Sequence, residues 1–196
     1  MPRIRTARLL LISATAADLE AELVSRDALA ASLGAVVPGS WPPELYDEAA
    51  VRWTLAALEA DPRFAEWGFY YVTIAPADTG VRPLLIGAGG FKGPPDSSGA
   101  VEVGYAIVPE QRRRGYAREA VDGWLSFAFA EPRVVRVMAN TLAELEPSIG
   151  VLRSAGFRFV GAGTDPHEPE AIRFEITRAE YEGTRAGRSV ARLVDR

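Results

Sequence analysis

The sequence has no cysteine and only one histidine, His167. The absence of thiols excludes disulfides, thiolate zinc sites and a cysteine-bound acyl intermediate. His167 stands among acidic residues and prolines, a setting that favours a loop over a catalytic site. One histidine also leaves few ligands for a metal cluster, so we expect no metal.

Long apolar runs are also missing. No segment reaches the ~18 residues that a membrane-spanning helix needs. The first residues, MPRIRTARLLL, have too short an apolar segment and no small-residue cleavage site, so they do not form a signal peptide. We therefore expect a cytoplasmic protein that contacts no membrane.

Nearly all cationic residues are arginines, and acidic residues outnumber the cationic ones. The 22 lysines and arginines comprise one lysine, Lys92, and therefore 21 arginines (22 − 1), against 26 acids, for a net charge of −4. This balance argues against a nucleic-acid partner, because neutralising phosphates requires a broad basic surface. With 196 residues, 48% of them hydrophobic, the chain suits one domain with a substantial core.

The apolar patterning predicts a mixed α/β domain in the order β-α-α-β-β-β-α-β-α-β-β. In the second helix the apolar side chains are Leu45, Ala49, Trp53, Ala56 and Ala57. Strands are expected at residues 8–13, 69–75, 84–91, 100–108, 133–139, 157–161 and 171–177, and helices at 16–33, 44–58, 115–131 and 147–155.

The stretch RRRGYA, residues 112–117, links the strand that ends at Pro109 to a helix that begins near Gly115. Free backbone N–H groups at the positive end of a helix suit a phosphate or pyrophosphate, and glycine lets the ligand approach closely. Arginines beside such a loop can add charge-assisted hydrogen bonds. On these residues alone, a solvated loop with a glycine at its turn stays an equal alternative.

Four ordered motifs resemble the GNAT superfamily of acyl-CoA-dependent N-acetyltransferases. RRRGYA matches its [R/Q]-x-x-G-x-[G/A] signature in the same strand-to-helix setting. The details are similar to the branch of ribosomal-protein N-terminal alanine acetyltransferases. Its motifs resemble TARLLL (6–11), EVGY (102–105), GYAREA (115–120) and PSIGVLRSAGF (147–157) here.

The resemblance covers residues 6–177 and implies a single GNAT-like domain at 1–177, of class α/β (α+β). A mixed central sheet of six to seven strands would be flanked by about four helices, and residues 178–196 would form a polar tail or an extra helix. It implies direct transfer of an acetyl group from acetyl-CoA, as co-substrate, to a primary amine in a ternary complex. The acceptor would be a protein N-terminus or a small-molecule amine, and the enzyme a monomer or homodimer.

The resemblance also implies where acetyl-CoA binds. Backbone amides of residues 113–118 would hold the pyrophosphate, and the strand edge at Ile107 and Val108 would pair with the pantetheine amides. A backbone N–H near Val108 would be the oxyanion donor. The implied cofactor-binding residues are Ile107, Val108, Arg112, Arg113, Arg114, Gly115, Tyr116, Ala117, Arg118 and Asn140.

Glu102 and Ser148 are the candidate catalytic residues. Glu102 shares a strand face with Gly104 and Ala106, where a carboxylate could take the proton of the amine; pairing with an arginine is the alternative. By the resemblance Ser148 bonds the departing sulfur, whereas a serine at a helix start can also simply cap it. Leu152 replaces the tyrosine acid of many family members.

Other residues leave alternatives open. Glu146 replaces the usual asparagine before the P/A-S pair, so Asn140 is the possible pantetheine contact. Glu119 is expected to be structural, because an acid in a first turn favours the helix dipole, and Trp124 to lie in the core. A catalytically silent acyl-CoA-binding sensor or scaffold is the alternative function. Acids of the early helical region weakly favour a cationic acceptor: Glu44, Asp47, Glu48, Glu59, Asp61 and Glu66.

Overall fold

One mixed sheet organises the chain, which a computed structural model describes over residues 2–76, 80–163, 170–184 and 192–194. The nine strands of these segments lie in the order β7-β8-β6-β5-β4-β3-β2-β1-β9. They are β1 (Arg3–Arg5), β2 (Leu9–Ser13), β3 (Phe69–Ile74), β4 (Leu84–Phe91), β5 (Ala100–Ile107), β6 (Arg136–Leu142), β7 (Arg158–Ala162), β8 (Ala171–Thr177) and β9 (Arg192–Val194). His167 lies outside the described residues.

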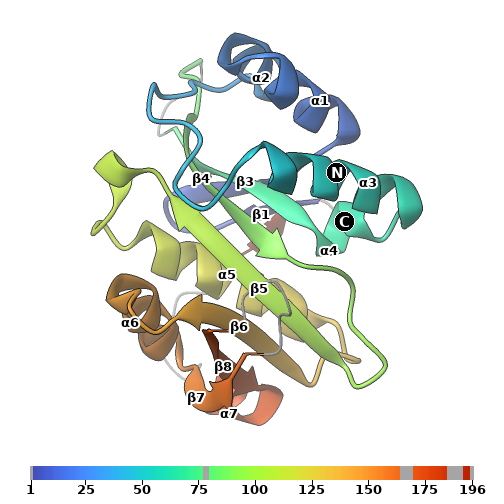
Figure 1. Cartoon of the computed structure of the whole chain (residues 1–196), viewed down its shortest axis with the longest axis vertical. Coiled ribbons are helices and arrows are strands. Elements are labelled where there is room, and N and C mark those ends of the chain that lie inside the picture. Colours follow the sequence, from blue (N-terminus) through green and yellow to red (C-terminus); the bar gives the residue numbers. More distant parts are fainter. Residues whose placement is uncertain (1, 77–79, 164–169, 185–191, 195–196) are drawn as a thin grey trace.

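Helices lie on both sides of β5, the strand that crosses the middle of the molecule in Figure 1. Helices α1 to α4 accompany the first half of the chain, and α6 lies beside β6. The helices are α1 (Ala16–Val24), α2 (Arg26–Leu33), α3 (Glu48–Ala60), α4 (Phe64–Trp67), α5 (Tyr116–Ala130), α6 (Glu146–Ala155) and α7 (Arg178–Thr184), with a 3₁₀ turn at Pro109–Gln111. The predicted mixed α/β class and the core of the predicted order are confirmed.

The predicted strand and helix counts are too low for physical reasons. Strands β1 and β9 have only three residues each, which is too short for a recognisable pattern. The helix expected at residues 16–33 is two helices, because Ser25 is extended and its hydroxyl accepts a hydrogen bond from the N–H of Ala28. Ser25 therefore ends α1 and caps α2.

The predicted strand at residues 133–139 is displaced in the structure. Residues 131–135 form the turn after α5, where the N–H of Val134 donates to the carbonyl of Glu131. Arg178, the first residue of α7, ties down this turn by donating to the carbonyls of Phe129, Glu131 and Val134. Strand β6 therefore begins only at Arg136.

The apolar face predicted for the second helix is also wrong. Leu45 precedes α3 and is 84% exposed, and Trp53 is 54% exposed, whereas Val51 and Thr54 are the buried residues of this helix. Trp124 of α5 is buried as expected. Trp53 is therefore a surface residue and does not belong to the hydrophobic core.

Strand β5 pairs with β6 over its first part and with β4 over its second part. It pairs antiparallel with β4 from Val103 to Ile107, but parallel with β6 only from Ala100 to Glu102. After the pair of Glu102 with Met138 the two central strands separate. The separation exposes one backbone edge of β5 between the two halves of the sheet.

Glu119 ties the turn between β1 and β2 to the start of α5. Its Oε1 accepts from the Thr6 hydroxyl at 2.5 Å and from the Arg8 N–H at 2.7 Å, and its Oε2 lies 2.7 Å from the Nε of Arg8. The Arg8 guanidinium also donates to the carbonyl of Arg114 and stacks over the Tyr116 ring. The first turn of the chain therefore holds the loop before α5.

We predict that Glu119→Ala destabilises the fold by about 1–3 kcal/mol, because it leaves partly buried donors without an acceptor. Burial raises the pKa of Glu119, but the hydrogen bonds from Thr6 and Arg8 outweigh it and leave the pKa below the ordinary 4.5. The stabilisation is thus present above about pH 4.5 and is lost as the pH falls through the lowered pKa.

Urea unfolding between pH 7 and pH 3 measures this loss, and the difference between wild type and variant should shrink toward pH 3. Glu48→Ala is the control, because Glu48 is exposed and pairs only with Arg52 of its own helix among the ion pairs identified. Equal destabilisation by both variants would contradict the assigned tie.

Candidate active site

The free edge of β5 is the backbone edge that faces β6 beyond Glu102. Every second residue directs its backbone N–H and carbonyl to this edge. The N–H of Val108 donates to the carbonyl of Ile86 at 2.9 Å, so Val108 uses its N–H within the sheet. Because the N–H groups of successive residues in a strand point to opposite edges, those of Tyr105 and Ile107 face the separated side. The N–H of Val108 itself is therefore used within the sheet, whereas the neighbouring Ile107 directs its N–H to the separated side.

The side chain of Arg112 fixes the end of this edge. Its Nε donates to the carbonyl of Ile107 at 2.9 Å, and its guanidinium pairs with Glu44 at 2.9 Å. The first arginine of the RRRGYA stretch thus holds the end of β5 against the loop before α3.

The loop between β5 and α5 has two residues in the left-handed region. Arg113 has φ 58° and Gly115 has φ 81°, and Gly115 is the residue before the first turn of α5. Such left-handed residues turn successive N–H groups toward one side of a loop. Arg113 and Arg114 are exposed, so their side chains are free to approach a ligand.

The start of α5 offers its backbone donors to a ligand. The first helical hydrogen bond runs from the N–H of Glu119 to the carbonyl of Gly115, and the residue before the helix supplies no side-chain cap. The N–H groups of Tyr116, Ala117 and Arg118 precede that bond and point out of the helix end. The side chain of Arg118 pairs with Asp122 one turn later. The geometry and sign of this end fit a pyrophosphate.

Ser148 meets Tyr105 across the separation of the strands. The Oγ of Ser148 lies 3.3 Å from the Oη of Tyr105, which also donates to the carbonyl of Ser148 at 3.2 Å. Leu145 precedes α6, and the helix has no side-chain cap. The Ser148 hydroxyl therefore does not cap α6, and it is connected to β5 instead. The buried Leu152 supplies no acid.

Tyr105 is a candidate that sequence reasoning missed as a functional residue, although it belongs to the EVGY motif. Burial raises the pKa of its phenol to about 12, against a smaller lowering by Ser148. The phenol therefore stays protonated near neutral pH and can donate a hydrogen bond.

Glu102 pairs with the single lysine of the chain, and no arginine partner for it is found among the described residues. Its Oε1 lies 2.6 Å from the Nζ of Lys92, and the carboxylate side chain is 20% exposed. It stands at the last paired position of β5 and β6. A partly exposed carboxylate at the point of separation can accept a proton from a nearby group.

Asn140 lies on β6 beyond the last pair with β5. Its Oδ1 accepts from Arg173 of β8 at 3.4 Å, and its buried Nδ2 has no hydrogen-bond partner among the described residues. A buried amide donor without a partner is costly and is normally satisfied by water or a ligand. Asn140 therefore has a spare donor on the strand that borders the separation.

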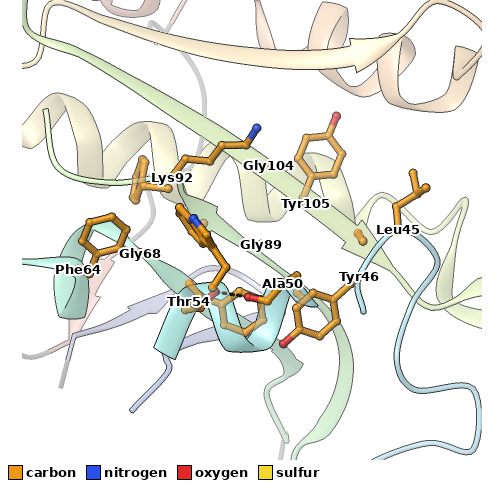
Figure 2. Close-up of a pocket in the computed structure, with 16 residues that line it drawn as sticks. Leu45, Tyr46, Ala50, Thr54, Phe64, Gly68, Gly89, Lys92, Gly104 and Tyr105 are labelled. Atoms are coloured by element: carbon orange, nitrogen blue, oxygen red, sulfur yellow. Dashed lines mark hydrogen bonds between the residues drawn. The ribbon is translucent and has the colours of Figure 1, made fainter. Parts of the chain in front are cut away.

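A cavity of about 460 Å³ opens beside the free edge (Figure 2). It lies between α3, the loop before it and strands β4 and β5. Its lining comprises Leu45, Tyr46, Ala50, Trp53, Thr54, Phe64, Gly68, Phe69, Ala88, Gly89, Gly90, Phe91, Lys92, Gly104, Tyr105 and Ala106. This volume suits a small organic molecule.

A half-buried carboxylate holds one wall of the cavity. Glu22 of α1 accepts hydrogen bonds from Trp41 at 2.7 Å, Tyr46 at 2.9 Å and Tyr71 at 2.7 Å. Burial raises the pKa of Glu22, although the three donors lower it in part. Because Tyr46 lines the cavity, Glu22 fixes that wall through side chains far apart in sequence, which no sequence motif indicates.

The acids of the early helical region do not line the cavity. Glu44, Glu48 and Asp61 pair with Arg112, Arg52 and Arg63, respectively. The described lining contains no acidic residue. The expectation that these acids favour a cationic acceptor therefore finds no support in the site.

Two negative findings concern the described segments alone. Within them, no group of three or more His, Asp or Glu side chains could hold a metal ion. None of the helices in this part of the chain is long and apolar enough to cross a membrane.

Known proteins share both the sequence pattern and the fold. The chain is 32% identical over 108 residues to the uncharacterized N-acetyltransferase YoaA of Bacillus subtilis, covering 55% of this chain and 56% of that protein. It thus spans about half the length of the curated relatives it matches.

Solved structures match over most of their length. A GNAT-family acetyltransferase from Bacillus anthracis superposes with a TM-score of 0.60 at 22% identity, covering 90% of this chain and 99% of that one. RimL, a ribosomal L7/L12 α-N-protein acetyltransferase in complex with coenzyme A, gives a TM-score of 0.59 at 12% identity, with coverages of 88% and 95%. These likenesses concern the fold.

The family model described as "Acetyltransferase (GNAT) domain" matches residues 8–158. That range runs from Arg8 to the start of β7 and includes the separated strands, the loop before α5 and α6. The resemblance found in the motifs is therefore confirmed, and the chain belongs to the GNAT acetyltransferase family.

Proposed function

We propose that the protein transfers an acetyl group directly from acetyl-CoA to a primary amine bound in the same complex. The observation that carries the proposal is the separation of β5 and β6 after Glu102, with an open helix end on one side and a cavity on the other. Acetyl-CoA, when bound, supplies an activated acyl group as a thioester.

The start of α5 and the edge of β5 would hold acetyl-CoA. The N–H groups of residues 113–118 face the pyrophosphate, and the exposed Arg113 and Arg114 add charge. The backbone of Tyr105 and Ile107 pairs with the amides of pantetheine, and Asn140 offers its spare Nδ2–H. Arg112 positions the end of this edge by donating a hydrogen bond to the Ile107 carbonyl.

The reaction then needs three functions from this chain. A backbone N–H on the free edge of β5 stabilises negative charge on the thioester oxygen, a contribution that can reach ~3 kcal/mol. Glu102 accepts the proton that the amine loses as its nitrogen bonds to the acetyl carbon, directly or through water. Ser148, held by Tyr105, donates a hydrogen bond to the sulfur as the carbon–sulfur bond breaks, and the departing thiolate takes its proton from water.

A thiol-release assay with acetyl-CoA and a panel of peptides, amino acids, polyamines and aminoglycosides tests the activity. Release of free CoA that depends on an amine supports the proposal. CoA binding without release for every amine would favour a silent acyl-CoA-binding module.

We predict that Gly115→Val weakens CoA binding at least about tenfold, whereas Arg113→Ala weakens it less than about fivefold. Valine is strained at φ 81° and shifts the N–H groups of α5. Alanine at Arg113 keeps the backbone and removes only an exposed charge, which is worth little. Calorimetric titration with CoA measures both, and the reverse order would show that charge dominates.

Glu102→Gln should lower turnover by about 10²-fold or more, the usual loss of a general base, and leave CoA affinity unchanged. Glu175→Gln is the matched control. Glu102 and Glu175 both pair with Met138, and their side chains are 20% and 18% exposed and both ion-paired. Steady-state kinetics with a saturating amine measures the loss, and similar effects of both variants would contradict the role of Glu102.

Tyr105→Phe and Ser148→Ala should each lower turnover about tenfold, and the double variant should lose little more, because the two hydroxyls act together. The pKa of about 12 keeps the phenol protonated, so wild type should show no inflection from it between pH 6 and pH 9. Tyr70→Phe is the control, since Tyr70 lies on β3 and its phenol donates to the backbone carbonyl of Glu66 in α4. Fully additive losses would count against a shared step.

A further inference from the structure

The cavity beside β5 has an aromatic lining that the acetyl-transfer proposal leaves unexplained. Six of its sixteen lining residues are aromatic and four are glycines. Tyr46 stacks on Phe69 at 5.1 Å with 19° between the rings, and Trp53 meets Phe64 edge-on at 6.0 Å. Two pairs of rings thus line the cavity together with a glycine-rich floor.

The rim of this cavity exposes apolar surface to solvent. Leu45 is 84% and Trp53 is 54% exposed, and both line the opening. Such exposed apolar side chains at a cavity indicate a surface that an apolar ligand covers. The described lining has no acid, and its only cation, Lys92, is paired with Glu102.

Glu102 lies on the same strand face as the floor of the cavity. Gly104 and Ala106 lie on the same face of β5 as Glu102, because side chains alternate along a strand. A Cβ added at Gly104 would meet no atom within 4 Å. Alternate residues of a strand are about 7 Å apart, so a ring over Gly104 and an amine beside Glu102 are separated by a linker of about two carbons.

We infer that the acceptor is a primary amine joined by a short linker to a flat apolar ring, and not a polyamine or an aminoglycoside. The inference rests on the proposed acetyl transfer for its reacting nitrogen, but the binding cavity is independent of turnover. The ring packs against the Tyr46–Phe69 and Trp53–Phe64 pairs, and the amine lies at Glu102. The ring can belong to a free amine or to the first residue of a peptide.

Binding is measured by calorimetry in the presence of CoA, so that no turnover occurs. The arms are phenethylamine, a peptide beginning with phenylalanine, spermidine and an aminoglycoside. One of the ring-bearing amines should bind at least about tenfold more tightly than either polycation, and comparison of the first two arms identifies the source of the ring. Equal or tighter binding of a polycation, or no binding of either ring-bearing amine, would overturn the inference.

Gly104→Val tests the position of the ring. It fills the floor of the cavity without a steric clash or a left-handed φ, so the variant should fold, bind CoA and lose at least about tenfold in affinity for the ring-bearing amine. Gly183→Val in α7 is the matched control, because its Cβ also meets no atom and it does not line the cavity. Unchanged binding by Gly104→Val would place the ring elsewhere and overturn the inference.

Thiol release with acetyl-CoA then separates the two proposals. Binding of the ring-bearing amine without release of CoA would leave the ligand class intact and refute the acetyl transfer. Release of CoA that is faster with spermidine than with either ring-bearing amine would leave the acetyl transfer intact and refute the ligand class.

Discussion

The separation of β5 from β6 is the constraint on which the site depends. Three paired residues hold the two strands together, and beyond Glu102 the backbone of β5 has a partner only on its β4 edge. Unpaired backbone groups inside a protein are costly. The chain satisfies the Ile107 carbonyl with Arg112 and connects β5 to α6 through Tyr105 and Ser148. The groups that remain are suited to the amides of an extended ligand.

The start of α5 is kept in place by residues from the opposite end of the sequence. Glu119 accepts hydrogen bonds from Thr6 and Arg8, and Arg8 also reaches the carbonyl of Arg114. The loop that would contact the pyrophosphate therefore depends on the turn between β1 and β2. This link explains why the TARLLL and GYAREA motifs occur together: their side chains meet, although more than 100 residues separate them.

Much of the fold follows from local sequence signals. The apolar runs of β4 and β8 and the helix after Gly115 were predictable, because each is long and ends at a clear turn signal. The three-residue edge strands, and the break at Ser25, depend on hydrogen bonds that periodicity does not contain. The exposed Trp53 illustrates another limit, since an aromatic residue at helical spacing normally indicates a core position.

The site was predictable where a motif specifies backbone geometry and less so where distant side chains meet. The motif around Gly115 indicated an open helix end, and the structure has one there. The contact of Tyr105 with Ser148, the cluster around Glu22 and the pairing of Lys92 with Glu102 join separate elements. Their formation depends on the order of strands in the sheet, which a single sequence does not specify.

Alternation along β5 separates the parts of the proposed reaction. Glu102 has its side chain on the face of β5 at which Gly104 lines the cavity, whereas Tyr105 points to α6, and the backbone N–H of Ile107 points to the separated edge. The amine would therefore lose its proton to Glu102 on one face of the strand, and the Ser148 hydroxyl would approach the sulfur from the other face. This arrangement keeps the carboxylate that accepts a proton away from the hydroxyl that donates a hydrogen bond to the sulfur, so the two do not bond to each other. One strand thus supplies base, oxyanion donor and support for the serine hydroxyl because its period is two.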